Sequence, residues 1–476
     1  MKILFAASEA SPFFVADGPG VMTGGLPPAL RRRQAEIRVV LPLYGDLNSE
    51  WREKLAFITS FMVPVGWRSQ YCGLFELTWQ DMTWYFLDNE YYFKRSGLYG
   101  FYDDGERFAF FSRAVLETLF HVDFAPDIIH CNDWQTALVP VYLNLYYRNI
   151  EKFTSLKTVF TIHDIRRQCT YGSETLEETL GIGRENMHIL EYRGAVNLTK
   201  GAIEAADVIS TVSPTYAQEI LNPVSSCGLD DFLQKKQGKL YGILNGIDIS
   251  GCSPLTDPHI AANYGLDDFP EGKRACKEAL REEFGLEGDR APLFAVASPF
   301  MEDRGLSLLL DAAEDLVGYG VQLVVMGYGG KEAEDFFSGL AHRRAGKAGT
   351  RIGFDRVLER QIYAGSDVFL LPSQIEPCGF EQMAALRYGA VPVARRTGGL
   401  RDTIRDNAEG TGNGFTFDAY TSRDMLGACL RAKDVYHREE AWTGLVRRAM
   451  RCDNSWSTSA TRYMDMYQRT LCQLTY

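Results

Sequence analysis

Two successive series of short apolar runs, separated by helix-like stretches, constrain the fold of this chain of 476 residues. Five such runs lie in the first half, among them 37–41 and 158–162, and four lie in the second, among them 293–297 and 368–371. Strands that alternate with helices pair in parallel, and helices cover both faces of the sheet. The sequence therefore predicts two Rossmann-like α/β domains, with binding sites at the carboxyl ends of the strands.

A polar, proline-containing connection near Leu240 separates the two series. We predict an N-terminal domain over residues 1–240 and a C-terminal domain over residues 241–455, with a hinge and a cleft between them. The last stretch is amphipathic, and we predict that residues 456–476 form a helix that crosses back to the first domain.

Composition excludes several classes of protein. A hydrophobic content of 46% with 24% charged residues is typical of a soluble globular chain. The formal charge of -12 offers no basic field for nucleic acid or anionic lipid, and no apolar run is long enough to span a membrane. Ten cysteines without a C-x-x-C pair, and no expected signal peptide, predict reduced thiols and a cytoplasmic location.

Histidine is sparse, with seven in the chain, and none of them forms an H-x-x-H or H-E-x-x-H array. Arrays of this kind supply the nitrogen ligands of structural and catalytic zinc sites. We therefore expect no metal site and no cofactor.

Two segments of the second half combine an acceptor carboxylate with phosphate-binding groups. In residues 372–379, Glu376 follows an apolar run and precedes the glycine turn at Gly379; further on, Arg395 and Arg396 precede a Thr-Gly-Gly turn. A carboxylate suits sugar hydroxyls, and backbone N–H groups and arginine suit phosphate. Each segment alone is also compatible with an ordinary βα loop. Together they predict a nucleotide-sugar site.

Collinear motifs along the whole chain resemble one known family, the ADP-glucose-type bacterial glycogen (starch) synthases, which are retaining glycosyltransferases of the GT-B fold. The resemblance runs from Met1 to about Tyr467, and it implies two Rossmann-like domains that face a cleft. The matching motifs lie at 8–10, 126–136, 161–163, 206–207 with 211–217, 239–248, 256–258 with 262–264, 376–379, 386–389 and 395–400.

The resemblance implies transfer of glucose from ADP-glucose to the nonreducing end of an α-1,4-glucan, with retention of the anomeric configuration and without a metal. The implied partners are thus ADP-glucose and an α-glucan. Neither nucleic acid nor a membrane is implied.

The resemblance also assigns roles to single residues. Glu376 matches the acidic residue that holds the donor sugar, and His163 matches a histidine whose neighbourhood contacts the sugar's 6-hydroxyl. Asp133 lies in the motif that lines the cleft. Some candidates also have a structural alternative. His163 could cap a strand end, Asp133 could be a helix N-cap before Trp134, and Cys378 could be a small buried hydrophobe.

By this resemblance the catalytic candidates are Glu376, His163 and Arg304. The substrate-binding candidates lie in turns and at strand ends, and they are Gly18, Asp133, Asn245, Cys378, Gly379, Arg395, Arg396, Thr397, Gly398 and Gly399.

The chain departs from the family pattern where the donor's phosphates are expected. Val15 stands at the position of a phosphate-binding lysine, and Asp17 at that of a glycine. In the second domain Pro299 replaces an arginine and Arg304 replaces a lysine, while Glu381 adds a negative charge. Removing one preorganised donor costs about 10²–10³ in rate, so we expect weak donor binding and slow transfer.

Three functions therefore remain open. The first is a slow synthase, which the retained Glu376 and His163 favour. The second is a catalytically impaired homologue that binds glucan or partners an active synthase, which Val15 and Pro299 favour. The third is a GT-B enzyme that uses another activated sugar or orthophosphate.

Overall fold

The structure is a computed structural model, and it describes residues 1–16, 18–288 and 290–472. Its contacts divide the chain into two compact units. The first is Met1–Gly246 together with the segment from Trp456, and the second is Ile247–Ser455. The break follows Gly246 rather than Leu240, because the strand that begins at Leu240 pairs with the sheet of the first unit.

The first unit is built on a nine-stranded sheet of order β12-β11-β7-β6-β1-β2-β5-β4-β3. Its strands are parallel except where β4 pairs antiparallel with β3 and β5. The strands are β1 (Lys2–Ala6), β2 (Glu36–Pro42), β3 (Ala56–Val65), β4 (Arg68–Trp79), β5 (Met82–Asp88), β6 (Ile128–Asn132), β7 (Lys157–Ile162), β11 (Val208–Thr211) and β12 (Leu240–Gly242).

A small three-stranded sheet of order β8-β10-β9 adjoins it in the same unit. Its strands are β8 (Thr170–Gly172), β9 (Glu191–Tyr192) and β10 (Ala195–Asn197). The helices of the unit are α1 (Gly18–Arg31), α2 (Ser49–Arg52), α3 (Glu90–Phe93), α4 (Asp104–Thr118), α5 (Leu138–Tyr142), α6 (Thr175–Glu178), α7 (Met187–Leu190), α8 (Leu198–Ala205), α9 (Pro214–Glu219), α10 (Asp230–Lys235) and α19 (Trp456–Cys472). Shorter helical turns are η1 (Trp134–Thr136), η2 (Leu143–Tyr147), η3 (Glu151–Phe153), η4 (Arg184–Asn186) and η5 (Gln237–Lys239).

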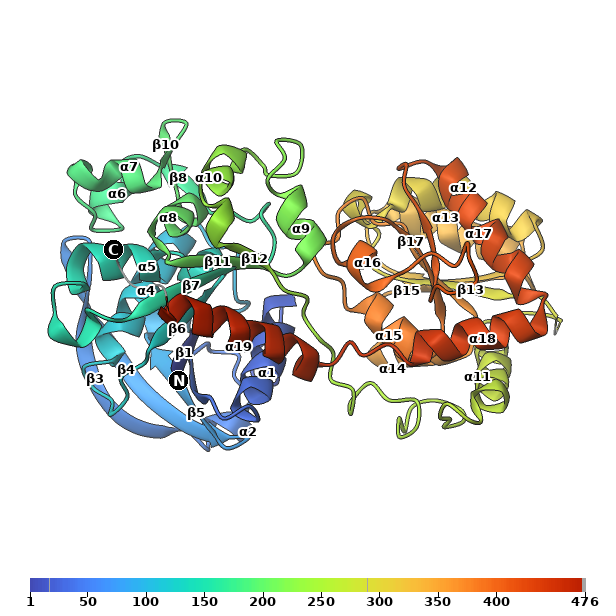
Figure 1. Ribbon diagram of the computed structural model, residues 1–476, viewed down its shortest axis with the longest axis horizontal. Coiled ribbons are helices and arrows are strands. Elements are labelled where there is room, and N and C mark those ends of the chain that lie inside the picture. Colours follow the sequence, from blue (N-terminus) through green and yellow to red (C-terminus); the bar gives the residue numbers. More distant parts are fainter. Residues whose placement is uncertain (17, 289, 473–476) are drawn as a thin grey trace. The chain divides into compact units, whose positions relative to one another are not determined.

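The C-terminal helix α19 packs on α1 within the first unit (Figure 1). Gly25 allows the close approach, because a Cβ atom at this position would overlap the indole of Trp456. The Tyr467 hydroxyl lies 2.6 Å from Nδ1 of buried His130, which ties the helix to β6. The last four residues of the predicted helix 456–476 lie outside the described residues.

The second unit contains a six-stranded parallel sheet of order β15-β14-β13-β16-β17-β18, which is the Rossmann order. The strands are β13 (Leu293–Ala297), β14 (Gln322–Gly327), β15 (Ala348–Ile352), β16 (Val368–Leu371), β17 (Val391–Arg395) and β18 (Phe415–Phe417). Helices cover both faces of this sheet (Figure 1). They are α11 (Phe269–Glu283), α12 (Leu306–Gly318), α13 (Lys331–Arg343), α14 (Arg356–Gly365), α15 (Glu381–Arg387), α16 (Gly398–Thr403), α17 (Ser422–Tyr436) and α18 (Glu439–Met450), with the short turn η6 (Glu302–Arg304).

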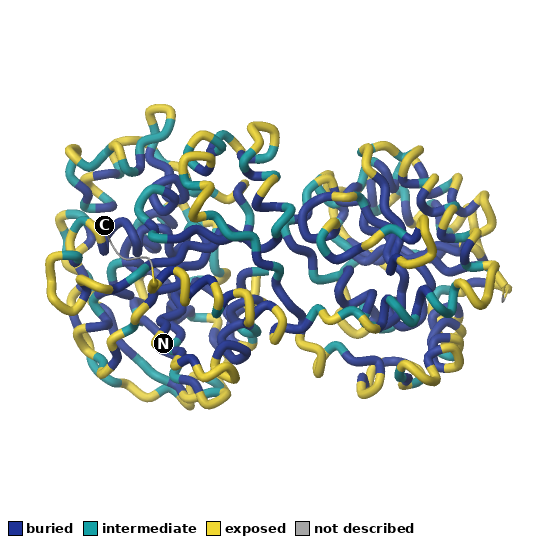
Figure 2. The backbone as a smooth tube through the Cα atoms, viewed as in Figure 1, coloured by how far each residue is buried: buried dark blue, intermediate teal, exposed yellow. Residues whose placement is uncertain are grey.

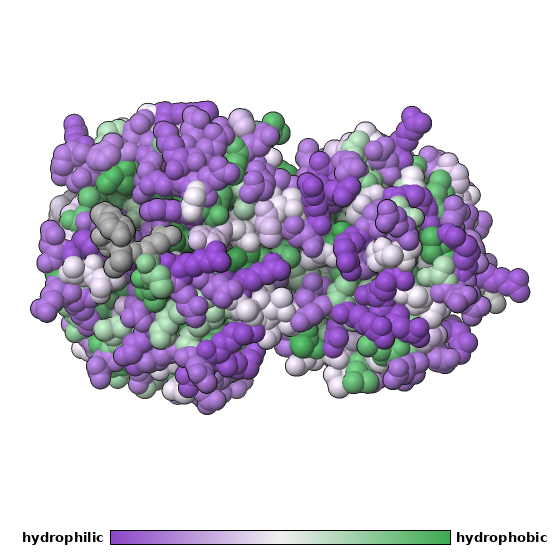
Figure 3. All heavy atoms as spheres, viewed as in Figure 1, coloured by the Kyte–Doolittle hydropathy of each residue, from purple (hydrophilic) through white to green (hydrophobic). Residues whose placement is uncertain are grey.

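The central parallel strands form the core of each unit, as the dark tube segments in Figure 2 show. Every residue of β6, β13, β14 and β16 is buried, as expected for parallel strands covered on both faces. Figure 3 shows a mostly hydrophilic exterior on each unit. Within the described part of the chain, the helices are too short or too polar to cross a bilayer.

The fold prediction is confirmed in its main feature, two α/β units with parallel sheets. The five runs predicted in the first half correspond to β1, β2, β6, β7 and β11, and the four in the second correspond to β13, β14, β16 and β17. The strands β3, β4 and β5, the edge strands β12, β15 and β18, and the small sheet were not predicted.

Candidate functional site

The strand order of the second unit places two predicted segments side by side. In this sheet β13 lies between β14 and β16, so the order of the strands reverses there. Ligands of open α/β sheets bind outside the carboxyl ends of the strands at this point. The segment after β13 carries Arg304, and the segment after β16 carries Glu376.

Arg304 and Glu376 form an ion pair at this position. Nη1 of Arg304 donates to Oε2 of Glu376, and the hydroxyl of Ser373 lies 3.4 Å from the same oxygen. Gly305 holds the Arg304 turn against the end of β16: its φ is +85°, and a Cβ atom there would overlap the carbonyl of Pro372. The pair was not predicted as a contact, because the two residues are 72 positions apart.

Burial changes the protonation of Glu376, which is 3% exposed. Loss of solvation raises the pKa of its carboxyl to about 7. The neighbouring Arg304 lowers this pKa and the carboxylate of Glu381 raises it. A buried carboxyl that titrates near neutral pH beside a cation is typical of a functional site.

The Thr-Gly-Gly turn packs directly on the segment that carries Glu376. The N–H of Gly399 donates to the carbonyl of Glu376 at 3.1 Å. Gly398 has a φ of +41°, and a Cβ atom there would overlap the Glu376 carbonyl, while one at Gly399 would overlap the Cys378 carbonyl. Both glycines are therefore required for the close approach of the two predicted segments.

The other candidates of this segment line the same turn. Gly379 has a φ of +72°, and the amide of Gln382 donates to the carbonyls of Cys378 and Gly379 at 2.9 and 3.1 Å. Cys378 and Thr397 are both buried. Gln382 was not among the predicted residues. It lies in the first turn of α15, three residues after Gly379, and this spacing is the signal that could have indicated it.

The two arginines differ in their partners. Nη1 of Arg395 donates to the carbonyl of Gln374 at 2.6 Å, and Nε donates to that of Asp418 at 3.2 Å. Arg396 is exposed, and its Nε lies 3.8 Å from Asp418 Oδ1. Arg395 thus ties the segment before Glu376 to the loop after β18.

Predicted residues of the first unit meet at the carboxyl ends of β6 and β7. Asp133 follows β6 and accepts a hydrogen bond from the backbone N–H of His163 at 2.9 Å. Nε2 of His163 lies 3.1 Å from Oδ1 of Asn132. Both Asp133 and His163 are buried, and burial raises the pKa of the Asp133 carboxyl to about 8.

The helix N-cap alternative for Asp133 holds for its position in the chain but not for its side chain. Asp133 does precede the short helical turn η1, but its side chain makes no capping hydrogen bond there. Its φ of +58° turns the carboxylate toward His163, which follows the neighbouring strand. The carboxyl accepts from His163 instead, because β7 lies beside β6 and both strands end at the same edge of the sheet.

Gly18 begins α1, beyond the first strand of the sheet. Before it, Val15 is 41% exposed, and the N–H of Ala16 donates to the carboxylate of buried Glu9 at 2.6 Å. The hydroxyl of Tyr99 also donates to Glu9, at 3.1 Å. Asp17, predicted at the position of a phosphate-facing glycine, lies outside the described residues.

Glu9 lies in the motif 8–10 but is not among the predicted site residues. The signal that could have indicated it is a carboxylate three residues after the buried strand β1. Asn245, a predicted binding residue, follows β12 in the same unit and is buried. Its side-chain oxygen has no hydrogen-bond partner among the described residues.

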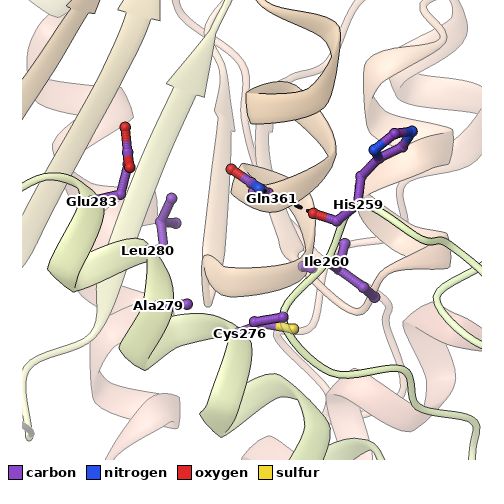
Figure 4. A pocket seen from close by; sticks show the side chains of 9 residues that line it. His259, Ile260, Cys276, Ala279, Leu280, Glu283 and Gln361 are labelled. Atoms are coloured by element: carbon purple, nitrogen blue, oxygen red, sulfur yellow. Dashed lines mark hydrogen bonds between the residues drawn. The ribbon is translucent and has the colours of Figure 1, made fainter.

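Two cavities of the second unit contain none of the predicted residues. One of about 250 Å³ lies between α11 and α14, beside the bond from Gln361 Nε2 to the carbonyl of His259 at 3.0 Å (Figure 4). Another of about 470 Å³ lies between α11 and α18, beside Trp442. Within 1–16, 18–288 and 290–472, no group of three or more His, Cys, Asp or Glu side chains could hold a metal ion.

Comparisons with known proteins agree with the two-unit fold. The model of the starch synthase catalytic domain matches residues 2–235, and that of glycosyl transferases group 1 matches residues 277–434. The sucrose-phosphate synthase of Thermosynechococcus elongatus, 15% identical, shares the fold with a TM-score of 0.60 over 98% of both chains. The two units thus define a glycosyltransferase of the GT-B fold.

Closer relatives define the family within this class. Glycogen synthases of Desulforamulus reducens and Geobacillus stearothermophilus are each 44% identical over 476 residues, which is 99% of this chain and 99% and 98% of theirs. The catalytic domain of starch synthase IV from Arabidopsis thaliana, solved bound to ADP and acarbose, is 33% identical, with a TM-score of 0.89 over 99% of both chains. The chain belongs to the glycogen synthase family and is a glucosyltransferase of the glycogen and starch synthase type.

Proposed function

We propose that this protein transfers glucose from ADP-glucose to the nonreducing end of an α-1,4-glucan, with retention of the anomeric configuration. The observation that carries the proposal is the buried Glu376 carboxyl, paired with Arg304 at the switch point of the second sheet. The related starch synthase IV was solved with ADP and acarbose, which supports a nucleotide and a glucan as ligands.

In this proposal the second unit holds the donor. Glu376 accepts hydrogen bonds from the hydroxyls of the glucosyl group, and Arg304 places a positive charge beside the diphosphate. Gly398 and Gly399 let their turn pack on the Glu376 segment, and in this proposal the backbone of that turn and of the Gly379 turn contacts the donor. As the bond from the glucosyl carbon to the diphosphate oxygen breaks, the diphosphate leaves with the bonding electrons and the acceptor hydroxyl oxygen of the glucan bonds to that carbon. The hydroxyl proton passes to the departing diphosphate, and Arg304 stabilises the negative charge that develops there.

The first unit supplies His163 and Asp133. The bond from the His163 N–H to the Asp133 carboxyl fixes the backbone of His163 relative to β6. We assign His163 to the glucosyl group and Asp133 to the positioning of His163. The reaction needs no metal or cofactor, and the ten cysteines, none of which forms a disulfide among the described residues, fit a cytoplasmic enzyme.

We expect the transfer to be slow. Val15, which is exposed, carries no charge where the family has a lysine. Pro299, two residues after β13, carries none where the family has an arginine. Each missing donor reduces the rate by about 10²–10³ when the effects are independent. Glu381 adds a carboxylate 4.0 Å from Arg304.

The same observations favour a second candidate function, a catalytically impaired homologue that binds glucan or partners an active synthase. Such a protein would keep the fold and the Glu376 segment while losing affinity for the donor. Binding to glycogen without binding to ADP-glucose would distinguish it from the slow enzyme.

Isothermal titration with ADP-glucose and incorporation of radiolabelled glucose into glycogen test both candidates. The slow synthase binds ADP-glucose and incorporates label, the Glu376→Ala variant incorporates none, and all new linkages are removed by an α-1,4-specific glucosidase. Absence of both binding and incorporation, together with cosedimentation with glycogen, would overturn the proposed function in favour of the impaired homologue.

A further inference from the structure

Glu381 contacts the cation on which the proposed donor site depends. It is the first residue of α15, and Oε1 of its carboxylate lies 4.0 Å from Nη1 of Arg304. Its other oxygen accepts a hydrogen bond from the N–H of Phe380 at 3.1 Å. The carboxylate is therefore held beside the guanidinium by its own backbone, with a side chain that is 26% exposed.

Arg304 thus faces two carboxylates, because the same Nη1 also donates to Glu376. The charge of Glu381 reaches further, since it contributes to the raised pKa of the Glu376 carboxyl and to that of Glu359 on α14. Asp303, beside Arg304 in the chain, also raises the pKa of Glu376. Around this cation the described charges are more negative than positive.

A second carboxylate at this distance acts differently on different ligands. A sugar nucleotide carries two negative charges on its diphosphate, whereas the free nucleoside diphosphate released by transfer carries about three near neutral pH, because its second terminal ionisation has a pKa near that of other phosphate monoesters. The new charge appears on the phosphate that was bonded to the sugar. A fixed carboxylate near the partner cation repels the product more strongly than the donor.

We propose that Glu381 is a charge-selectivity residue of the donor site: it competes with the diphosphate for Arg304, and it weakens the binding of the free nucleoside diphosphate more than that of the sugar nucleotide. This inference rests on the proposed function for the location of the donor. It goes beyond that function because it assigns to this chain a residue that favours release of the product over its retention.

The test compares Glu381→Gln, which removes the charge and keeps the shape and an acceptor for the Phe380 N–H, with Glu359→Gln as the matched control. Glu359 is half-buried in the same region, but its carboxylate accepts a hydrogen bond from the Tyr363 hydroxyl at 2.9 Å. Isothermal titration measures Kd for ADP and for ADP-glucose with the wild type and both variants, at low and at high salt.

Glu381→Gln is expected to lower the Kd of ADP about tenfold or more and the Kd of ADP-glucose by a smaller factor. Both decreases should be larger at low salt. Glu359→Gln is expected to change both Kd values by less than about threefold. Glu381→Ala gives the same direction as Glu381→Gln if the charge is the cause, and circular dichroism checks that each variant is folded.

Equal Kd values for the wild type and Glu381→Gln, equal gains for the two ligands, or equal effects of the two glutamine variants would overturn the inference. So would the lack of ADP binding by every variant. A different outcome would overturn the proposed function. If the variants bind ADP as expected but incorporate no glucose into glycogen at any donor concentration, the synthase activity is contradicted and the charge selectivity stands.

Discussion

The carboxyl of Asp133 accepts a hydrogen bond from the backbone N–H of His163 at 2.9 Å, and the N–H of Asp133 donates to the carbonyl of Thr161 at 2.9 Å. Asp133 is thus fixed at two points to the carboxyl end of β7. Because β6 and β7 are adjacent parallel strands, residues that follow them are brought together although they are 30 positions apart in the chain.

Replacing Asp133 by alanine leaves the buried N–H of His163 without its acceptor. An unsatisfied buried donor costs about 1–3 kcal/mol, so we expect a clear fall in the midpoint of thermal unfolding and a loss of glucosyl transfer. Asp133→Asn keeps an oxygen acceptor and tolerates the positive φ, and it should lower the midpoint much less. Equal midpoints for the two variants would show that the hydrogen bond does not hold His163 in place.

The pKa of the Glu376 carboxyl, raised by burial from 4.5 to about 7, predicts a pH dependence of stability. The folded chain keeps this proton to a higher pH than the unfolded chain does. Stability should therefore fall as the pH rises from about 4.5 to about 7, by roughly 3 kcal/mol at most for this group. Glu376→Gln has no proton to lose, so the difference between its unfolding midpoints at pH 5 and pH 8 should be smaller than in the wild type. An unchanged difference would contradict the assignment.

Arg304 is the cation of the proposed donor site, and its substitution tests the location of the diphosphate. Arg304→Ala should abolish the residual binding of ADP-glucose, because it removes the positive charge and leaves Glu376 and Glu381 facing the ligand. Arg304→Lys, which carries the residue the family has at this position, should retain binding. Titration with ADP-glucose measures both, and an unchanged affinity of the alanine variant would place the pocket elsewhere.

Much of the fold follows from the sequence because parallel strands buried on both faces are nearly continuous apolar runs. The run 368–371 is one such strand, β16, and every residue in it is buried. In contrast, β4 has polar residues such as Gln70 and Glu76 between apolar ones, and β3 has exposed residues such as Phe57. The stretch 61–65 of β3 is apolar, but only every second residue of it is buried, because one face of this strand is exposed. Strands exposed on one face lack the fully buried apolar run by which the parallel strands were predicted.

The proposed site was predictable where its residues follow neighbouring strands. The Glu376 segment follows β16 and the Gly398 turn follows β17, so the pairing of these strands brings both motifs together. Contacts that depend on loops were not predictable: Tyr99 reaches Glu9 from a loop 90 residues away. Neither the hydrophobic periodicity of the sequence nor the spacing of its motifs indicates such a contact.

The glycine turn offers a test in which backbone strain and steric overlap are separated. Gly398→Ala should lower the unfolding midpoint by several degrees and abolish donor binding, because the added methyl group overlaps the Glu376 carbonyl at a φ of +41°. Gly410→Ala is the matched control, since its φ is +74° and the space around it is open. Calorimetry and titration should show a mild loss of stability and normal donor binding for this control. Equal effects of the two substitutions would mean that backbone strain alone, rather than the contact with Glu376, explains why position 398 needs a glycine.

The last prediction concerns the missing cation of the second unit. Pro299 is half-buried directly beyond β13, and Arg304 follows on the same segment. Pro299→Arg introduces the charge that the motif resemblance implies for this position, and each donor to the diphosphate is worth about 10²–10³ in rate. We therefore expect this variant to bind ADP-glucose at least tenfold more tightly and to incorporate glucose faster.

Met301→Arg controls for the added charge, because Met301 lies in the same segment but is exposed. It should raise the affinity only slightly, and the slight gain should disappear at high salt, as expected for an exposed charge. If Pro299→Arg folds normally and binds ADP-glucose no more tightly than Met301→Arg does, the lost arginine is not the cause of weak binding. The carboxylates of Glu376 and Glu381, which outnumber Arg304 at this site, would then be the main obstacle to the diphosphate.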